Sequence, residues 1–505
     1  MLSLVIVNNP KDWNFDIDNV EVVPAKTYLT DSEFAEVRNV RIYNLCRSYR
    51  YQSIGYYVSL LAEARGHKVF PSVTTIQDLK SQSVIRINSD ELDQLIQRSL
   101  SKLKSKKFEL NIYFGQSVAK QYDTLSKQLY SAFQAPLLTA SFSFNKKWIL
   151  QNVNPISLND IPEGQRDYVS ELAKQYFAKK RFRSLKKSNT VYDLAILVNP
   201  EDKCPPSNPR AMKNFMSAAE TVGLSTDLIT KDDFSKLPEF DALFIRDTTA
   251  VNHYTYRFAQ RAAAEGLVVI DDPESIIKCT NKVYLAELLI KAKIPRPKTL
   301  IIHKDNQDII PSILGLPCVL KQPDSSFSLG VAKVENRQEL QEKLDMFLDK
   351  SELIIAQEFM PTDFDWRIGI LDRMPLFACK YYMSKGHWQI MNWHSPHKKT
   401  GLDYGDVEAV PVEQVPERVL KMALRAANLV GAGFYGVDLK EKGDRVVVVE
   451  INDNPDVEAG REDGVLKDKL YLMIMKSIFS RIKLKKEKVL DSTSTIDKTD
   501  SMGRS

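Results

Sequence analysis

The sequence predicts an α/β protein of several domains, and two observations support that prediction. Short runs of β-branched residues alternate with longer amphipathic segments through most of the chain, which is the pattern of strands and helices packed in layers. The chain has 505 residues, a length that fits two to four domains of ordinary size. We expect five regions, at residues 1–150, 151–190, 191–280, 281–484 and 485–505.

The composition is ordinary for a globular protein. Hydrophobic residues make up 43% of the chain and charged residues 27%, and a net charge of +5 is small for this length, so a nucleic-acid partner is not indicated. No apolar run reaches the ~18 residues of a membrane span, and residues 1–10 fit a strand better than a signal peptide. The five cysteines are scattered without a CxxC pair, which favours reduced thiols. We expect a cytoplasmic protein without a membrane partner.

The first region, residues 1–150, shows strands and helices in alternation. Its clearest segments are predicted strands at residues 2–7, 68–71 and 109–114 and a predicted helix at residues 54–65. Gly66 follows that helix, at a position where glycine commonly ends a helix in the left-handed conformation. The region is therefore expected to form a small α/β domain.

A cationic and aromatic cluster precedes this helix. It consists of Arg47, Tyr49, Arg50 and Gln52. Two arginines can recognise a carboxylate, so the cluster is a candidate site for an anionic substrate. The alternative is the solvated start of a helix, which the sequence favours.

The middle of the chain contains a linker and a second α/β region. Residues 151–190 are predicted to hold a helix and, from Lys179 to Lys187, a basic run that fits a solvated face better than a contact with nucleic acid. Residues 191–280 follow the pattern strand, helix, strand, strand, helix, strand. Residues 485–505 are polar and are expected to be disordered.

The most informative local signal is a predicted hairpin in the fourth region. Residues 436–438 belong to its first strand, and a β-branched run follows the turn at residues 442–444. Pairing of these strands brings Asp438 near Glu450, and Asn452 shares a strand face with Glu450 because the two are two residues apart. Two carboxylates and an amide oxygen suit Mg²⁺. The alternative is an ordinary polar end of a buried strand.

Two lysines upstream are candidates for phosphate binding. Lys321 ends an apolar strand and precedes a loop of small residues at 324–331, whose backbone N–H groups could face phosphates. This loop is not a Walker A loop, because no Gly-Lys-Ser/Thr follows its glycine. Lys282 lies at a predicted helix start, where the helix dipole does not favour a lysine. For each of these lysines, a solvated surface position is the alternative.

Further charged residues lie between the lysines and the hairpin. A predicted buried strand at residues 353–361 runs into a proline turn, and Asp365 and Arg367 stand at the start of the next strand. A further strand at residues 375–382 contains Lys380. The order along the chain is two lysines, a strand ending at a turn, Asp-x-Arg, a lysine, an aspartate and Glu-x-Asn.

This order of motifs resembles the ATP-grasp superfamily, specifically its RimK-like branch of ribosomal-protein glutamate ligases. The resemblance covers about residues 191–480 and rests on the motifs at residues 272–276, 281–282, 357–359, 365–367, 436–438 and 450–452. It implies an ATP-grasp fold, in which two α+β subdomains grip ATP. A pre-ATP-grasp α/β domain at residues 191–280 would precede that fold, and residues 1–150 look like the extra N-terminal domain that some RimK-like ligases carry.

The resemblance implies a role for each candidate residue. It places cofactor binding at Lys282, Lys321, Glu358, Phe359, Met360, Asp365 and Asn392. It places the metal ligands at Asp438, Glu450 and Asn452. It places Arg367 and Lys380 against the transferred phosphoryl group or the acyl phosphate.

One motif departs from the family pattern. RimK-like ligases usually carry an arginine two residues before the asparagine of an Asn-x-His motif, followed by glycines. Here Ile390 replaces the arginine before Asn392, and residues 395–397 replace the glycines. Lys398 or Lys399 could supply the missing cation. The identity of the acceptor pocket is therefore left open.

The resemblance implies an ATP-dependent carboxylate–amine ligase that works through an acyl phosphate. Its cofactors would be ATP and Mg²⁺ or Mn²⁺, with two ions. Glutamate or a similar amino acid would be added to a peptide, protein or small-molecule carboxylate. The alternative is a catalytically weak, nucleotide-binding regulatory protein that acts on a ribosomal or other partner. The sequence does not fix the oligomeric state, and a homo-oligomer is compatible with it.

Overall fold

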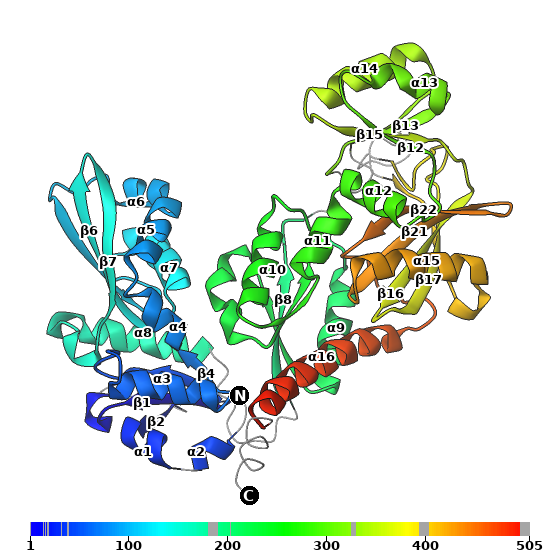
Figure 1. Cartoon of the computed structure of the whole chain (residues 1–505). Coiled ribbons are helices and arrows are strands. Elements are labelled where there is room, and N and C mark those ends of the chain that lie inside the picture. The colour runs from blue at the N-terminus through cyan, green and yellow to red at the C-terminus, as the bar shows by residue number, and fades with distance from the viewer. Residues whose placement is uncertain are drawn as a thin grey trace, which may run out of the picture. The chain divides into compact units, whose positions relative to one another are not determined.

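The computed structural model divides the chain into two compact units (Figure 1). Unit 1 comprises Met1–Tyr192 and Asp232–Glu239, and unit 2 comprises Asp193–Lys231 and Phe240–Ser505. The structure describes residues 2–13, 15, 17, 20–31, 33–37, 40–179, 190–202, 204–324, 330–392 and 403–494. Within these ranges, no helix combines the length and the apolar character that a membrane crossing requires.

The first layer of unit 1 is a four-stranded parallel sheet with the order β2-β1-β3-β4. Its strands are β1 (Leu2–Val7), β2 (Glu21–Pro24), β3 (Val40–Asn44) and β4 (Lys68–Phe70). The helices are α1 (Ala25–Thr30), α2 (Glu33–Glu36), α3 (Ile54–Ala64) and α4 (Val73–Asp78). Ser53 caps α3, and Gly66 follows that helix with a φ of 71°. The predicted strand–helix alternation and the glycine stop are confirmed here.

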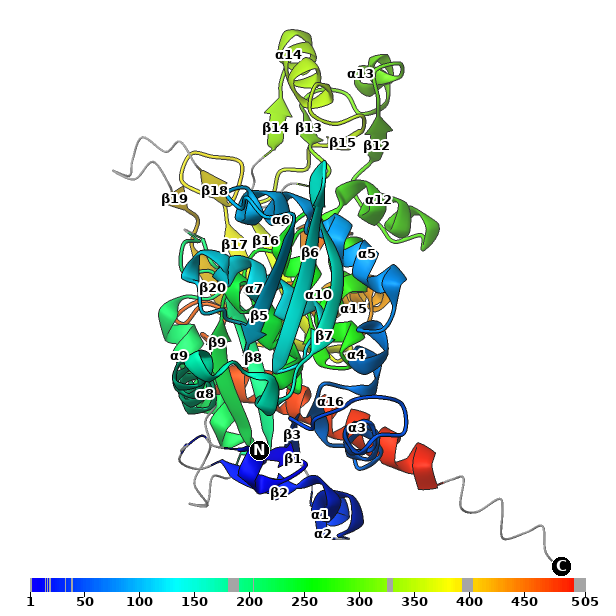
Figure 2. The same ribbon diagram turned by 90° about the vertical axis from the view of Figure 1, so that its left-hand side faces the viewer.

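A separate antiparallel sheet completes unit 1. The sequence predicted one of its strands, at residues 109–114, but not the other two. Its strands β5 (Lys107–Tyr113), β6 (Leu137–Asn145) and β7 (Lys147–Pro155) lie side by side (Figure 2). The associated helices are α5 (Gln82–Glu91), α6 (Asp93–Leu100), α7 (Asp123–Ala132) and α8 (Arg166–Lys179). Buried apolar side chains from this sheet and from α5 to α7 form one core.

Unit 2 begins with a second four-stranded sheet, with the order β9-β8-β10-β11. Its strands are β8 (Tyr192–Val198), β9 (Leu224–Ile229), β10 (Ala242–Arg246) and β11 (Val268–Ile270). Its helices are α9 (Pro209–Thr221), α10 (Tyr254–Ala264) and α11 (Pro273–Thr280). The strand order repeats that of the first sheet of unit 1, with the first and third strands adjacent. In such sheets, ligands bind where the strand order reverses, beyond the carboxyl ends of the strands.

Two antiparallel sheets follow in unit 2. The smaller one has the order β12-β15-β13-β14, and the larger has the order β20-β17-β16-β21-β22. The strands of the smaller sheet are β12 (Thr299–Ile302), β13 (Cys318–Lys321), β14 (Val331–Val334) and β15 (Ile354–Glu358). The strands of the larger sheet are β16 (Phe364–Leu371), β17 (Met374–Tyr382), β20 (Val407–Val410), β21 (Phe434–Lys442) and β22 (Arg445–Asn452). A two-stranded ribbon pairs β18 (Met391–Asn392) with β19 (Asp403–Tyr404).

Helices pack against these sheets. They are α12 (Lys282–Lys291), α13 (Ile310–Ile313), α14 (Arg337–Leu348) and α15 (Glu417–Val430). The last helix, α16 (Asp468–Ser494), packs instead on α9 and β11. The apolar face of α15 packs on one face of the larger sheet (Figure 1), where Ile368, Val437 and Ala423 are fully buried. The opposite face of that sheet is therefore left for polar side chains.

The C-terminal segment is more ordered than the sequence predicts. The segment 485–505 was expected to be disordered, but α16 continues to Ser494, so its first ten residues are helical. Lys486 lies 2.9 Å from the buried carboxylate of Asp241, which helps to explain this order. Most of the basic run between Lys179 and Lys187 lies outside the described residues. All five cysteines are free thiols.

Candidate active site

One cavity of about 460 Å³ in unit 2 collects most of the predicted site residues. It is lined by the smaller antiparallel sheet, by the larger one, and by the loops after β8 and β10. These loops follow the carboxyl ends of adjacent parallel strands, where α/β sheets bind ligands. The predicted residues that line the cavity are Lys282, Lys321, Glu358, Phe359, Met360, Asp365, Arg367, Asp438, Glu450 and Asn452.

The predicted hairpin exists and aligns the three candidate metal ligands. In the register of β21 and β22, Asp438 is opposite Glu450 and Gly436 is opposite Asn452. The Asn452 amide donates to Asp438 Oδ2 at 3.2 Å. Among the described residues no group of three or more His, Cys, Asp and Glu side chains is placed to hold a metal ion, so this candidate set depends on its asparagine. Two carboxylates and an amide oxygen are ligands that Mg²⁺ accepts alongside phosphate and water.

The ionisation of the two carboxylates is set by opposing effects. Burial raises the pKa of Asp438, against the opposing effect of the Arg367 guanidinium. Burial also acts to raise the pKa of Glu450, but Lys282 and Lys321 outweigh it and hold that pKa below its ordinary value. Glu450 is therefore a charged ligand candidate between two ammonium groups.

Lys282 and Lys321 approach Glu450 from different elements. Asn281 caps α12, which places Lys282 in the first turn, and its Nζ lies 2.9 Å from Glu450 Oε1. Lys321 ends β13, and its ammonium group has no hydrogen bond or ion pair with any described residue. Burial lowers the pKa of Lys321 to about 8. An anionic ligand in the cavity would stabilise the charged form of this lysine.

An apolar pocket lies beyond the end of β15. Phe359 packs edge-on against Trp388 at a centroid distance of 5.9 Å, and the Lys333 ammonium lies 4.6 Å from the Phe359 ring centre. Met360 is buried beside them. The Glu358 carboxylate, in contrast, is held by Arg445 and by the backbone N–H of Lys298. A flat heteroaromatic ring fits this mixture of aromatic and apolar side chains.

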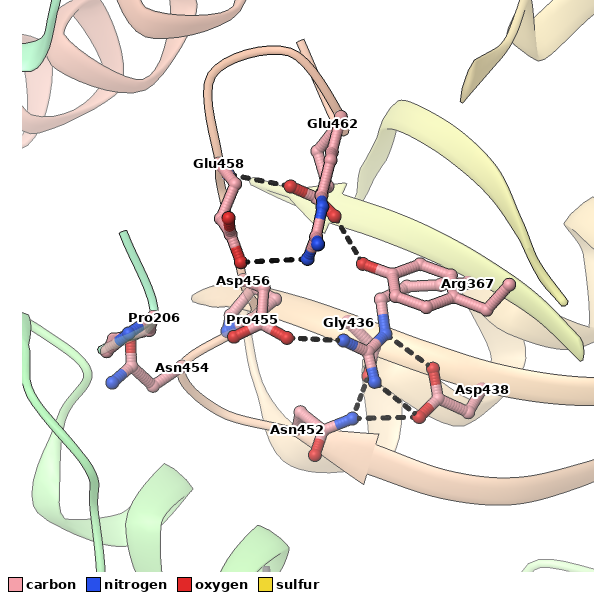
Figure 3. Close-up of polar contacts among 12 residues, drawn as sticks. Pro206, Arg367, Gly436, Asp438, Asn452, Asn454, Pro455, Asp456, Glu458 and Glu462 are labelled. Carbon is pink, nitrogen blue, oxygen red and sulfur yellow. Dashed lines mark hydrogen bonds and ion pairs between the residues drawn. The ribbon is translucent and has the colours of Figure 1, made fainter. Parts of the chain in front are cut away.

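Asp365 and Arg367 lie on the cavity face of β16. Asp365 is paired with Lys440 and accepts from the Thr362 hydroxyl. Lys440 was not among the predicted residues, although it stands two residues after Asp438 on the same strand, and that spacing was the available signal. Arg367 donates to both oxygens of Asp438, at 2.7 and 2.8 Å (Figure 3). Asp438 Oδ2 also accepts from Asn452, whereas Oδ1 accepts from Arg367 alone and keeps a lone pair for a metal ion.

Lys380 and Asn392 do not line the cavity. In the register of β16 and β17, Lys380 is opposite Trp366, whereas Arg367 is opposite Cys379, so Lys380 and Arg367 point to opposite faces. Lys380 lies near the Trp366 and Phe364 rings and 3.5 Å from Glu408. This placement does not support the expectation that Lys380 faces the transferred phosphoryl group. Asn392 pairs with Asp403 in the small ribbon, and the candidate cations Lys398 and Lys399 lie outside the described residues.

Comparison with known proteins gives the family. A family model described as the RimK-like ATPgrasp N-terminal domain matches residues 25–172, and one described as the RimK-like ATP-grasp domain matches residues 279–374. A probable alpha-L-glutamate ligase of Vibrio vulnificus (strain YJ016) is 26% identical over 237 residues, which are 46% of this chain and 74% of that protein. The chain therefore has a RimK-like N-terminal domain and a RimK-like ATP-grasp domain, and its relatives are named ligases.

A further relative and two solved structures are also similar to this chain. The alpha-aminoadipate--LysW ligase LysX of Saccharolobus solfataricus is 27% identical over 265 residues, which are 48% of this chain and 88% of that protein. The structure of a RimK domain ATP-grasp protein from Sphaerobacter thermophilus aligns at 19% identity and a TM-score of 0.44, over 56% of this chain and 98% of that chain. A D-alanine--D-alanine ligase from Bacillus anthracis, complexed with ATP, aligns at 15% identity and a TM-score of 0.44. The alignment covers 58% of this chain and 100% of that chain.

An acidic loop of the ligase also lines the cavity, and it was not predicted from the sequence. The acidic loop, residues 453–462, follows the metal-candidate strand β22. Asp456 accepts from Arg367 at 3.0 Å, and Glu458 accepts from Arg461 at 3.1 Å (Figure 3). Glu462 is buried and accepts from the Tyr381 hydroxyl. The available signal was four carboxylates within ten residues after a buried strand, between turn residues.

A buried arginine anchors the acidic loop of the ligase. Arg246, at the end of β10, is 2% exposed and donates to Asn454 Oδ1 at 2.7 Å and to the Pro455 carbonyl at 3.0 Å. It also donates to the Pro206 carbonyl and to the Ser207 hydroxyl, in the loop after β8. All its contacts stay within unit 2. Arg246 therefore links the loops after β8 and β10 to the acidic loop.

The cationic cluster expected in unit 1 does not converge on one site. The Arg47 guanidinium is paired with Asp12, and this pair holds the pKa of Asp12 below its ordinary value. Tyr49 is buried, and its hydroxyl donates to the Asn44 carbonyl. These contacts fit the structural alternative, in which the segment forms the start of α3.

Proposed function

We propose that this ligase joins a carboxylate to an amine through an acyl phosphate, with ATP bound in the cavity of unit 2. One observation supports the proposal above all others. A free lysine, Lys321, a second lysine, Lys282, and the carboxylates of Asp438 and Glu450 converge in one cavity. Cations for phosphate oxygens and oxygen ligands for a divalent ion are the parts that phosphoryl transfer requires.

The cavity offers a place for each part of ATP. We assign the adenine ring to the pocket of Phe359 and Met360, with backbone groups of residues 358–360 at its edge. Lys282, Lys321 and Lys440 would face the phosphates, with Asp365 positioning Lys440 through their ion pair. Residues 191–280 and 281–484 would together form the ATP-binding part of the enzyme.

The candidate metal site fits the chemistry of its donors. Asp438, Glu450 and Asn452 would hold Mg²⁺ or Mn²⁺, as a pair of ions, and a bound ion would offset charge on the phosphate oxygens. Arg367 donates to Asp438 and Asp456, which fixes its guanidinium between the candidate metal site and the acidic loop. From that position it would stabilise the acyl phosphate. We assign no role to Lys380 or Asn392, because neither lines the cavity.

The reaction consists of two transfers. A carboxylate oxygen of the acid substrate attacks the γ-phosphorus of ATP, and ADP leaves with the bonding electron pair. The amine nitrogen, having lost a proton, then attacks the carbonyl carbon of the acyl phosphate. The C–O bond breaks, phosphate leaves, and an amide remains. Exclusion of water from the cavity would prevent hydrolysis of the acyl phosphate.

The names of the relatives make glutamate the first amino acid to test. One relative is named an alpha-L-glutamate ligase and another an alpha-aminoadipate--LysW ligase, and both names refer to amino acids or their analogues. A test is mass spectrometry of products formed from ATP, Mg²⁺, glutamate and a cell extract. The expected result is a new amide that contains glutamate or another amino acid and that requires ATP. ATP consumption without any new amide would contradict the proposal.

A further inference from the structure

The cavity has two parts, and Arg367 is bonded to residues of both. The nucleotide end contains the candidate metal ligands and three lysines, Lys282, Lys321 and Lys440. The acidic end is formed by the acidic loop and by the loops after β8 and β10. Arg367 donates to Asp438 of the metal site and to Asp456 of the acidic loop. The orientation of this one guanidinium group is therefore important for the proposed reaction.

Tyr381 reaches the guanidinium from the neighbouring strand β17. In the register of β16 and β17, Tyr381 is opposite Asp365, so it lies on the sheet face that also carries Arg367. Tyr381 and Arg367 are thus diagonal neighbours, which an aromatic and a long side chain can bridge. The same alternation turns Lys380 away from the cavity, whereas Tyr381 lines it.

The Tyr381 ring supports the flat face of the guanidinium. The Arg367 Cζ atom lies over this ring, 4.6 Å from its centre, and Tyr381 is only 6% exposed. A cation is attracted to an aromatic face, more strongly where water is excluded. The hydrogen bonds to Asp438 and Asp456 lie near the guanidinium plane, so they set its direction within that plane. The ring contact sets the tilt of the plane.

That tilt decides where the remaining donors of Arg367 point. An arginine has five N–H donors in a rigid planar group. Nε and Nη2 donate to Asp438 and Nη1 donates to Asp456, which uses three of them. One N–H on Nη1 and one on Nη2 have no partner among the described residues. Their direction determines whether they can meet the oxygens of a transferred phosphoryl group.

A buried carboxylate holds the far end of the ring. Glu462 is 2% exposed and accepts from the Tyr381 hydroxyl through one oxygen. Its other oxygen accepts from the Glu458 backbone N–H at 2.6 Å. The ring is therefore fixed at its hydroxyl while its face meets Arg367.

We propose that Tyr381 is a positioning residue, whose ring sets the tilt of the Arg367 guanidinium toward the transferred phosphoryl group. The inference rests on the proposed function and adds a residue that acts through Arg367. The alternative is that Tyr381 only anchors the acidic loop through Glu462. The two roles use different parts of the side chain, because the first needs the ring and the second needs the hydroxyl.

The test uses the full chain and a mimic of the transferred phosphoryl group. Calorimetric titration measures the affinity for ADP with Mg²⁺, and again for ADP with Mg²⁺ and tetrafluoroaluminate. The ratio of the two affinities is the phosphoryl gain. Tyr381→Leu removes the ring and is expected to lower the phosphoryl gain about ten-fold, with the affinity for ADP unchanged. Tyr381→Phe keeps the ring and is expected to change the gain less than about two-fold.

Tyr382→Leu is the matched control. Tyr382 is the next residue of β17, it faces the other side of the sheet, and its hydroxyl donates to Glu408. This variant is expected to leave both affinities unchanged. An unchanged phosphoryl gain in Tyr381→Leu would overturn the inference. Equal losses in Tyr381→Phe and Tyr381→Leu would overturn it too, since the hydroxyl would then be the part that matters.

A further variant covers a loss of folding. Tyr381→Met fills a similar space without a ring, and it replaces the leucine variant if that variant does not bind ADP. A loss of phosphoryl gain with normal ADP affinity in Tyr381→Met supports the positioning role. A loss of ADP binding in both variants would make the ring a general support of the cavity and would overturn the inference.

Failure of this inference can be told apart from failure of the proposed function. Arg367→Met is expected to remove most of the phosphoryl gain. If the unmodified chain shows no gain, or if Arg367→Met keeps it, the proposed role of Arg367 is wrong and the inference falls with it. If Arg367→Met loses the gain and Tyr381→Leu keeps it, only the positioning role of Tyr381 is wrong.

Discussion

The nucleotide end and the acidic end of the cavity are built from different kinds of structure. At the nucleotide end, Lys321 and Glu358 stand at the ends of strands in a small antiparallel sheet, and Lys282 begins a capped helix. At the acidic end, the charged groups lie in loops, and a single buried arginine holds those loops together. The comparison shows that regular elements position the charged groups of the nucleotide end, whereas the acidic end depends on one hydrogen-bond network.

The largest expected effect therefore concerns Arg246. The variant Arg246→Met leaves several buried acceptors without a donor, and we expect it to lower the free energy of unfolding of unit 2 by about 3–5 kcal/mol. Urea denaturation followed by circular dichroism measures the change. Arg210→Met is a matched control, because Arg210 is exposed on α9. A loss below about 1 kcal/mol would mean that the acidic loop does not depend on this arginine.

The next largest effect concerns a carboxylate of the candidate metal site. Glu450→Gln keeps the side-chain shape but removes one charge from the candidate metal site, so we expect ligase activity to fall more than about a hundred-fold. The fold should be retained, because Glu450 is partly exposed and its side chain is not part of the apolar core. Initial rates at saturating Mg²⁺ give the result. Normal turnover by this variant would remove Glu450 from the metal site.

A smaller effect is expected at the nucleotide end. Lys321→Ala removes a charge-assisted contact with phosphate, worth roughly 1.5–3 kcal/mol, so ATP affinity should fall about ten- to a hundred-fold. Calorimetric titration of an ATP analogue measures it. Lys350→Ala serves as the control, because Lys350 is an exposed lysine that follows α14. An unchanged affinity for the analogue would make Lys321 a structural residue at the end of β13.

The smallest effect distinguishes the two faces of the larger sheet. Lys440→Met should lower ATP affinity about three- to ten-fold, because Lys440 faces the cavity beside Asp365. Lys380→Met should change it less than about two-fold, because Lys380 points to the opposite face. The same titration applies to both variants. The reverse order of the two effects would contradict the placement of these lysines.

Much of the nucleotide end could be predicted from the sequence, because its signals are local. The alternation of β22 places Glu450 and Asn452 on one face. The turn at residues 442–444 alone would put Val449 opposite Asp438, and an irregularity between Asp438 and Leu439 shifts the register so that Glu450 lies there. Asn281 likewise marks the start of the helix that carries Lys282. These predictions required no knowledge of distant parts of the chain.

The rest could not be predicted, because it depends on pairing between distant segments. The face of Lys380 depends on the register between β16 and β17, which includes a shift between Gly369 and Ile370, and a change of one residue reverses every side chain. The acidic loop resembles an ordinary solvated loop in the sequence. Only its contacts with Arg246 and Arg367 show that it is part of the cavity.

Phosphorus-31 NMR of the reaction shows whether ATP is used for ligation through an acyl phosphate. The purified chain is incubated with ATP, Mg²⁺ and mixtures of amino acids and peptides. Control reactions contain the amino acids alone or the peptides alone. The account predicts that ADP and inorganic phosphate accumulate together and that their formation requires both a carboxylate and an amine. Formation of AMP and pyrophosphate, or ADP formation that is independent of any amine, would contradict it.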